Sequence, residues 1–374
     1  MSRFLSFVVF LSILNLACGS TNGDLVVSTT RPSATVATSS VPDSSPTTTV
    51  SVGATTAVTT TVIAESWFGP RHPLTGLPAP DGPLQHPALA VKVGNNDMNS
   101  LPHEGLEDAD VVYEALIENG KTRFVAIYQS NVPSRVGPIR SARSTDIDLI
   151  GNLNLPFFAY WGSNEGVGAE VAAASRRGTF IPKTTTNDGQ KYLVRDITRG
   201  ESPYDGVLQA SGLMESIAGA TPEPIFDYGE SGGVSIPSLG VHWDTGARSV
   251  DYLWDTKSSR WLRYQDGKPL LNSSGVQLAA DNVLVLYVDY DRSSADSNSP
   301  QALTTGNGDG WLFRDGTVTG ITWDRQFPVD PWRLEDDDLK RRIQLDFGTT
   351  WVALAQLGEA SMLDPLSVAV LTGQ

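Results

Sequence analysis

Residues 310–323 read GWLFRDGTVTGITW. Apolar, aromatic and β-branched residues flank the pair Asp315-Gly316, and these residue types are enriched in β-strands. An Asp-Gly pair between two such runs suits a tight two-residue hairpin turn. The stretch therefore predicts a β-hairpin with strands over 310–313 and 318–323.

The same pattern extends through the rest of the second half of the chain. A second Asp-Gly pair, Asp266-Gly267, suits another tight hairpin. Further runs rich in Val, Tyr, Trp and Leu predict strands. These runs are 240–243, 250–255, 260–264, 282–290, 342–345 and 350–354. We therefore expect residues 239–374 to form a mostly β C-terminal domain.

The first half of the chain mixes the two kinds of element. Short helices are expected at 144–153 and 165–174. The strands expected in this half are 88–93, 110–117, 122–129 and 157–161. Proline and glycine are dense over 221–238, which reads TPEPIFDYGESGGVSIPS, and this density marks a boundary that we place at 227–238. The expected fold class is α+β, with an N-terminal α+β domain at 67–226.

The first eighteen residues have the pattern of a bacterial lipoprotein signal. Arg3 precedes an apolar run of fourteen residues, 4–17, which is shorter than the about 20 residues that a bilayer span needs. Cys18, the only cysteine in the chain, follows this run. We expect Cys18 to carry a lipid that anchors the protein to the bacterial cell membrane, facing the extracytoplasmic space. The alternative is an ordinary signal peptide with a chance cysteine.

A Ser/Thr-rich linker follows the signal. Between residues 20 and 61, 21 of 42 residues are Ser or Thr and none is aromatic. Such a composition cannot bury enough apolar surface to offset the entropy of ordering. We expect residues 19–66 to be a disordered tether, either O-glycosylated or a bare spacer.

Composition excludes several classes of function. The chain has 27 Lys plus Arg against 42 Asp plus Glu, a net charge of -15, which argues against nonspecific binding to nucleic acid. A single cysteine excludes an intrachain disulfide, a Cys-based zinc site and a CxxC redox pair. No cofactor is expected, since the sequence contains neither a P-loop nor a G-x-G-x-x-G motif.

Eight short strings, four in each half of the chain, together carry a resemblance to one known family. In the first half these strings are PLTGLP at 73–78, ADVVYE at 109–114, TRF at 122–124 and VGPIRSAR at 136–143. In the second half they are YQDG at 264–267, DNV at 281–283, GITW at 320–323 and FGTTWV at 347–352. These strings resemble the YerB-like family of bacterial lipoproteins, whose function is unknown. The resemblance covers about 67–357 and implies a layered β/α sandwich for the N-terminal domain. It implies no chemistry.

An arginine-rich turn is the candidate binding site. A Gly-Pro turn that leads into a helix can present guanidinium groups and backbone amides to an anion. The candidate anion- or ligand-binding residues are Arg123, Arg140, Ser141 and Arg143, with Glu114, Asp146 and Arg195 as possible supporting residues. The alternative is that these arginines form structural ion pairs with nearby carboxylates.

Four other motifs favour a structural interpretation. GESGG at 229–233 fits G-x-S-x-G but lies in the interdomain boundary, and HEGLE at 103–107 lacks the second histidine of a metalloprotease helix. The acids of 289–296 have no EF-hand spacing. The charges of 335–342 indicate a solvated turn. Most of the seven tryptophans after residue 240 are expected in the core, and exposed ones would favour glycan binding.

Two hypotheses for function remain. The first is a noncatalytic binding or assembly lipoprotein of the cell envelope that recognises a wall polymer or another envelope protein. The second is an enzyme acting on a wall glycan, peptide or phosphate ester, with Arg123, Arg140 and Arg143 holding an anionic group and Glu114 or Glu118 as base. We expect no catalytic metal, because four histidines and one cysteine are too few for the usual ligand sets.

Overall fold

The computed structural model describes residues 67–215, 219–229 and 233–373. Cys18 and the expected tether lie outside the described residues, as does Ser231 of the G-x-S-x-G motif. Among the described helices, none has both the length and the apolar character needed to cross a membrane.

The predicted hairpin is present near one edge of the larger sheet. Strands β17 (Gly306–Arg314) and β18 (Thr317–Arg325) pair in antiparallel register, with Trp311 opposite Gly320. The two turn residues, Asp315 and Gly316, have φ of 42° and 67°. Both lie in the left-handed region that a tight two-residue hairpin turn requires.

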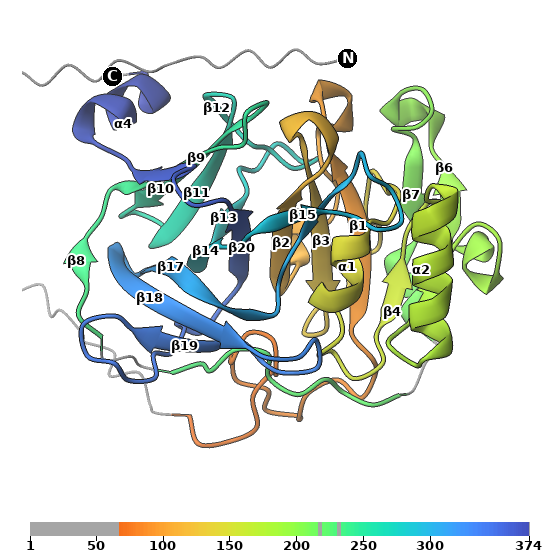
Figure 1. Ribbon diagram of the computed structural model, residues 1–374, viewed down its shortest axis with the longest axis horizontal. Coiled ribbons are helices and arrows are strands. Elements are labelled where there is room, and N and C mark those ends of the chain that lie inside the picture. The colour runs from red at the N-terminus through yellow and green to blue at the C-terminus, as the bar shows by residue number, and fades with distance from the viewer. Residues whose placement is uncertain (1–66, 216–218, 230–232, 374) are drawn as a thin grey trace, which may run out of the picture. The chain divides into compact units, whose positions relative to one another are not determined.

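One mixed sheet takes strands from both halves of the chain (Figure 1). Its order is β19-β18-β17-β14-β20-β2-β3-β1-β4-β5, and β8 pairs with β18. Its other strands are β1 (Leu89–Asn95), β2 (Val111–Leu116), β3 (Thr122–Tyr128), β4 (Phe157–Ala159), β5 (Ile181–Lys183), β8 (Ile236–Pro237), β14 (Asn282–Tyr287), β19 (Arg333–Asp336) and β20 (Thr350–Ala355). Because β20 runs parallel to β2 on one side and to β14 on the other, it joins the two halves.

A second sheet belongs to the C-terminal half alone. It has the order β12-β11-β10-β9-β21, with β13 paired to β11. Its strands are β9 (Gly240–Asp244), β10 (Ser249–Asp255), β11 (Arg260–Gln265), β12 (Lys268–Pro269), β13 (Ala279–Ala280) and β21 (Ala360–Met362). Two further pairs are β6 (Leu193–Arg195) with β7 (Gly206–Leu208), and β15 (Tyr290–Arg292) with β16 (Pro300–Ala302).

Helices are short and few in the described part of the chain. They are α1 (Ser144–Leu149), α2 (Glu165–Arg176), α3 (Ala210–Met214) and α4 (Pro365–Thr372). Asn164 caps α2 by accepting a hydrogen bond from the amide of Val167 at 2.8 Å. In Figure 1, α1 and α2 lie toward one side of the molecule and α4 lies beside the second sheet on the other.

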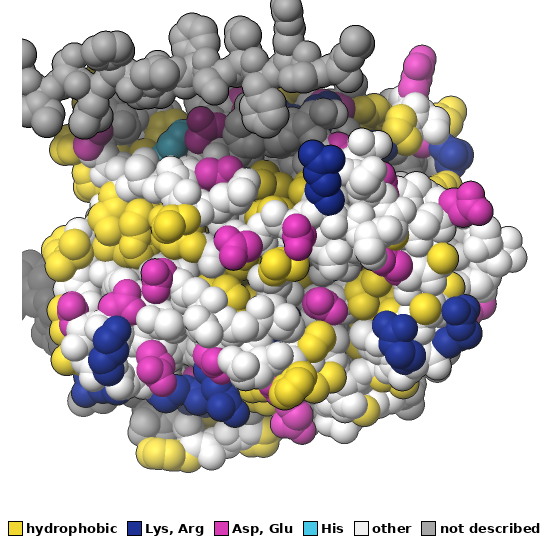
Figure 2. All heavy atoms as spheres, viewed as in Figure 1, with side chains coloured by type: hydrophobic (Ala, Val, Ile, Leu, Met, Phe, Trp, Pro, Cys, Tyr) yellow, Lys and Arg dark blue, Asp and Glu magenta, His cyan; other side chains and the backbone are white. Residues whose placement is uncertain are grey.

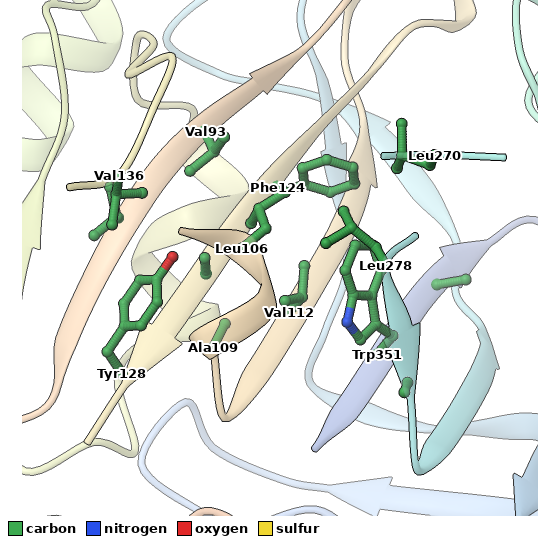
Figure 3. Close-up of a cluster of buried hydrophobic side chains, with 14 of the residues drawn as sticks. Val93, Leu106, Ala109, Val112, Phe124, Tyr128, Val136, Leu270, Leu278 and Trp351 are labelled. Carbon is green, nitrogen blue, oxygen red and sulfur yellow. The ribbon is translucent and has the colours of Figure 1, made fainter. Parts of the chain in front are cut away.

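The core has two layers, one on each face of the large sheet. Alternation along β2 directs Val111 and Tyr113 to one layer and Val112 to the other. The first layer includes Val167 and Val171 of α2. The second packs against the smaller sheet, and Figure 3 shows part of it, with Val112, Phe124 and Trp351 close to Leu270 and Leu278. Strand alternation therefore directs successive side chains of β2 into two different apolar layers.

The mixed α and β composition and the mostly β second half are confirmed, with two corrections. The strand expected at 342–345 is wrong, because only isolated bridges at Arg342 and Leu345 form there. The solvated turn expected at 335–338 is partly wrong, since Asp336 belongs to β19 and is 1% exposed. Its carboxylate accepts amide hydrogen bonds from Val234 and Leu339, both at 2.7 Å, which compensates the burial.

Most tryptophans of the second half are in the core, as expected. The buried ones are Trp243, Trp261, Trp323, Trp332 and Trp351. Trp254 and Trp311 are partly buried and pack against the second layer. None of these seven is fully exposed, so they do not form the open aromatic platform that would favour glycan binding.

Candidate functional site

The arginine-rich turn lies along the end of β1. Ile139 forms a bridge with Val93, and the amide of Arg140 donates to the carbonyl of Lys92 at 2.8 Å. The amide of Gly94 in turn donates to the carbonyl of Pro138 at 2.8 Å. These backbone bonds place the Arg140 side chain over Gly94.

Gly94 makes room for two neighbouring guanidinium groups. It pairs with Arg123 across the β1–β3 ladder, and paired residues direct their side chains to the same face of a sheet. A Cβ atom at Gly94 would lie 2.5 Å from Cγ of Arg140. Because Gly94 has no side chain, the stem of Arg140 can cross the sheet beside Arg123.

Arg123 is a buried cation with few partners. It is 6% exposed and donates one side-chain hydrogen bond, from Nη1 to the carbonyl of Ser141 at 2.9 Å. Within the described residues it forms no ion pair, and its buried Nε has no hydrogen-bond partner. Burial, and after it the charges of Arg143 and Arg140, lowers the pKa of Arg123 to about 9. The group therefore keeps its positive charge at neutral pH.

Arg140 is half-buried and forms no ion pair with any described residue. Its Nη1 donates to the carbonyl of Pro203 at 3.0 Å, and its guanidinium lies 5.0 Å from the ring centre of Tyr204. Burial lowers the pKa of Arg140, and the nearby positive charge of Arg143 lowers it further. Two adjacent arginines thus lack a carboxylate partner within the part of the chain that the structure describes.

A small cavity of about 50 Å³ lies beside this turn. Arg140, Ser141 and Arg195 are among its lining residues. Arg195 donates from Nη1 to both carboxylate oxygens of Asp205, at 2.7 and 2.8 Å, and its guanidinium lies 5.0 Å from the ring centre of Trp161. The structure therefore brings Arg195 to Arg140 and Ser141, although 52 residues separate it from Arg143 in the sequence.

Arg143 is neutralised by a carboxylate. Its Nε and Nη2 donate to the two oxygens of Glu118 at 2.8 and 2.9 Å. Burial would raise the pKa of Glu118, but the hydrogen bonds from Arg143 and Ser299 hold the pKa at about 2. Arg143 therefore forms the structural ion pair that the sequence left as an alternative.

The Asp146 carboxylate likewise already has partners within the protein. It accepts a hydrogen bond from the amide of Arg143 at 2.7 Å and so caps α1. The same carboxylate lies 2.5 Å from Nζ of Lys92, and both side chains are almost fully buried. Burial lowers the pKa of Lys92, while the Asp146 charge opposes that shift. Asp146 thus stabilises the start of the helix and offsets a buried cation.

Glu114 lies on the opposite face of the sheet from the arginine turn. In register it faces Phe124, whereas Arg123 faces Ala115. Its carboxylate pairs with Nη2 of Arg263 at 2.9 Å and accepts from Thr122 at 2.7 Å. Glu114 therefore belongs to a polar cluster between the two sheets, where it pairs with Arg263, and it does not meet Arg123, Arg140 or Arg143. Since Glu118 is held ionised by Arg143, neither carboxylate is placed as a free base at this turn.

Sequence reasoning missed three members of this site. Lys92 is a lone cation in an apolar strand, and Gly94 and Tyr204 belong to segments far from the turn in sequence. No local motif marks them. Only the strand register and the approach of the 203–204 segment place them beside Arg140.

The other motifs do not form a metal centre. Among residues 67–373 that the structure describes, no group of three or more His, Cys, Asp or Glu side chains could hold a metal ion. His103 is fully buried and its Nε2 lies 2.8 Å from the carbonyl of Gly94, while burial lowers its pKa to about 3. Glu107 accepts from Asn272 at 2.9 Å, and Asp296 accepts from Asn164 at 2.6 Å. These groups hold loops together.

The chain matches a family of proteins whose function is not known over both of its halves. Residues 74–222 match the family described as "Protein of unknown function (DUF3048) N-terminal domain". Residues 239–352 match its "C-terminal domain". The chain belongs to this family, as the YerB-like resemblance implied.

Individual relatives agree with this assignment. The chain is 28% identical over 262 residues to "Putative lipoprotein YerB" of Bacillus subtilis (strain 168), a match that covers 68% of this chain and 77% of that protein. The crystal structure of YerB protein from Bacillus subtilis superimposes with a TM-score of 0.66 at 23% identity, over 79% of this chain and 100% of the other. The two proteins therefore share a fold.

Proposed function

We propose that the protein is a bacterial cell-envelope lipoprotein whose folded part binds an anionic group noncatalytically at the arginine turn. Cys18 provides the membrane anchor on the extracytoplasmic side, and residues 19–66 connect this anchor to the folded part. The target is a phosphate or carboxylate group of a wall polymer or of another envelope protein. The binding residues are Arg123, Arg140 and Ser141, with Arg195 beside them.

The observation that supports binding is that Arg123 and Arg140 lie next to each other. A charge removed from water loses hydration energy unless an opposite charge or hydrogen bonds replace it. Arg143 is compensated by Glu118, whereas Arg123 and Arg140 have no ion pair within the described residues. An anion at Arg140 would supply the missing opposite charge, and a guanidinium offers two parallel donors to it.

The signal pattern and the relative support the location. The Bacillus subtilis relative is named as a lipoprotein, and Cys18 follows a short apolar run behind Arg3. Lipidation is worth about 0.8 kcal/mol per buried CH2, so several acyl chains on one cysteine would hold the protein on the membrane.

We propose a domain division on the same basis. The N-terminal α+β domain at 67–226 is organised as a layered β/α sandwich, and the C-terminal domain occupies 239–374. The two family matches support this division, and the packing of α2 on the large sheet supports the layered arrangement.

The anchor is tested by Cys18→Ala in the full-length chain. We expect the variant to leave the membrane fraction and to be found in the soluble fraction of cell extracts. Labelling with a radioactive fatty acid provides the matching readout, because only the chain that retains Cys18 should incorporate it. A variant that stays in the membrane fraction would contradict lipidation.

Anion binding is tested with Arg140→Gln in the full-length protein. Isothermal titration with inorganic phosphate should show binding to the wild type that weakens as salt is added, and at least tenfold weaker binding to the variant. Arg177→Gln, which removes an exposed arginine just after α2, is the matched control and should bind like the wild type. Equal affinities for all three proteins would refute the proposed site.

A further inference from the structure

A cavity of about 350 Å³ lies between the loop that follows β1 and the β11–β12 hairpin. Its volume falls within the range of small-molecule pockets, about 300–1,000 Å³. Six of its nine lining residues are apolar: Met98, Leu101, Pro102, Pro269, Leu270 and Leu271. It is separate from the arginine turn, since the two cavities share no lining residue.

The side chains that line this cavity become less exposed from its mouth to its base. Met98 is 56% exposed and Leu271 is 41% exposed, whereas Leu270 is 1% exposed. Leu270 belongs to the core between the two sheets, where Figure 3 shows it near Phe124. The cavity therefore leads from solvent to the apolar core. Each methylene group of an apolar chain that enters it would be removed from water.

A buried amide with an unpaired donor lies beside this cavity. Gln265 is 4% exposed and lines the cavity. Its Oε1 accepts from Nδ2 of Asn95 at 2.9 Å and from Nη2 of Arg263 at 3.2 Å, which fixes the amide orientation. Its Nε2 has no hydrogen-bond partner among the described residues. Buried donors in native proteins are nearly always satisfied, so this one calls for an acceptor. Because the atom has almost no accessible surface, an acceptor in the cavity reaches it when the side chains that cover the amide shift.

A lysine lies on the same face as this amide. Lys268 pairs with Gln265 across the hairpin, so the two side chains project to one side. Lys268 lines the cavity, is exposed, and forms no ion pair with any described residue. The third polar lining residue, Asp266, is already paired with Arg248 and accepts from the amide of Ser249 at 3.2 Å. The free polar groups here are therefore donors, and one of them is charged.

We propose that this cavity binds a small amphiphilic carboxylate, with its apolar chain along the apolar lining and its carboxylate on Gln265 and Lys268. A carboxylate accepts hydrogen bonds only, which matches an amide N–H beside an ammonium group, and charge assistance strengthens such bonds. A medium-chain fatty acid has this chemistry. The site is independent of the arginine turn, so either proposal can fail without the other.

The test is calorimetric titration of the full-length chain carrying Cys18→Ala, which avoids detergent. Octanoate should bind, butyrate should bind more than about 100-fold more weakly because it lacks four methylenes, and octan-1-ol should bind at least tenfold more weakly than octanoate because it lacks the charge. The segment before residue 67 is the same in every protein compared, so differences between variants report on this cavity.

Two variants and a control distinguish the site from general apolar binding. Lys268→Gln should weaken octanoate at least tenfold and leave octan-1-ol unchanged. Leu271→Asp, at the half-exposed mouth, should weaken both. Lys257→Gln removes another exposed lysine, from the turn at the other end of β11, and should bind octanoate like the wild type. Octan-1-ol that binds as tightly as octanoate, or variants that bind both like the wild type, would overturn the proposal.

Discussion

At the residue scale, Gly94 controls whether Arg140 can lie beside Arg123. Gly94→Ala leaves every charge in place but puts a methyl group where the Arg140 stem now lies, 2.5 Å from its Cγ. We expect phosphate affinity to fall several-fold, because the two guanidinium groups separate. Titration of the variant with inorganic phosphate measures this.

A matched glycine provides the control for that substitution. Gly212 in α3 has only ordinary contacts at 3.7 Å from where its Cβ would be, both to the ring of Tyr192. Gly212→Ala should therefore leave phosphate affinity unchanged. If Gly94→Ala binds phosphate like the wild type, then the position of Arg140 does not matter for binding.

The Glu118–Arg143 pair makes stability depend on acid pH. The folded pKa of Glu118 is about 2, below the ordinary value of 4.5, so its contribution to stability is present above about pH 4.5 and is lost as pH falls toward 2. We expect Glu118→Gln to be less stable than the wild type at pH 7, with the difference shrinking between pH 4.5 and pH 2. Urea unfolding at pH 7, 4.5 and 3 measures this, and a constant difference would show that the pair does not titrate as stated.

At the element scale, the two Asp-Gly hairpins differ in what surrounds the glycine. Gly267 and Gly316 have nearly the same φ, 70° and 67°. A Cβ at Gly267 would meet nothing within 4 Å, whereas one at Gly316 would lie 2.7 Å from Nε1 of Trp254. Alanine substitutions at Gly267 and Gly316 therefore separate the cost of backbone strain from the cost of side-chain crowding.

We predict unequal costs for alanine at these two turns. Gly267→Ala should lower the free energy of unfolding by about 1 kcal/mol, the cost of a left-handed residue with a Cβ. Gly316→Ala should cost about 1–3 kcal/mol more, because Trp254 must also move. Thermal or urea unfolding of both variants measures the difference. Equal losses in the free energy of unfolding would mean that Trp254 moves aside at no energetic cost.

At the scale of the whole molecule, the shared sheet couples the two halves. Strand β20 of the second half lies between β2 of the first half and β14, with parallel pairing on both sides. Each half would therefore expose an unpaired edge if the other unfolded. We predict that residues 67–373 unfold in a single cooperative transition.

Comparison of two probes tests this prediction. Urea unfolding followed by tryptophan fluorescence reports mainly on the second half, where seven of the nine tryptophans lie. Hydrogen exchange of the β1 and β3 amides reports on the first half. Coincident free energies of opening are expected, whereas two separate transitions would show that the halves are thermodynamically independent.

The surface charge fits a protein that recognises local anionic groups, since the face shown in Figure 2 has no broad basic area. The chain has a net charge of -15, and acidic and basic side chains are interspersed over the face shown in Figure 2. Any attraction of an anion must therefore act at short range, through groups such as Arg123 and Arg140, because screening weakens charges at longer distances.

Local patterns in the sequence predicted the elements. The hairpin at 310–323, the central strands of both halves and the start of α1 at Ser144 follow from turn chemistry and from runs of apolar and β-branched residues, which act over a few residues. Residues 342–345 were predicted wrongly because an apolar alternation alone does not show whether a partner strand is present.

Tertiary structure alone determined which side chains meet. The sequence grouped Arg123, Arg140, Arg143 and Glu114, but the register of β2 and β3 places Glu114 and Arg123 on opposite faces, since adjacent residues in a strand alternate sides. The partners that distinguish Arg143 from Arg140, and the cavity at Gln265, come from segments distant in the chain. A sequence pattern records the type and spacing of residues, whereas ion pairing and burial depend on distances that exist only after the chain has packed.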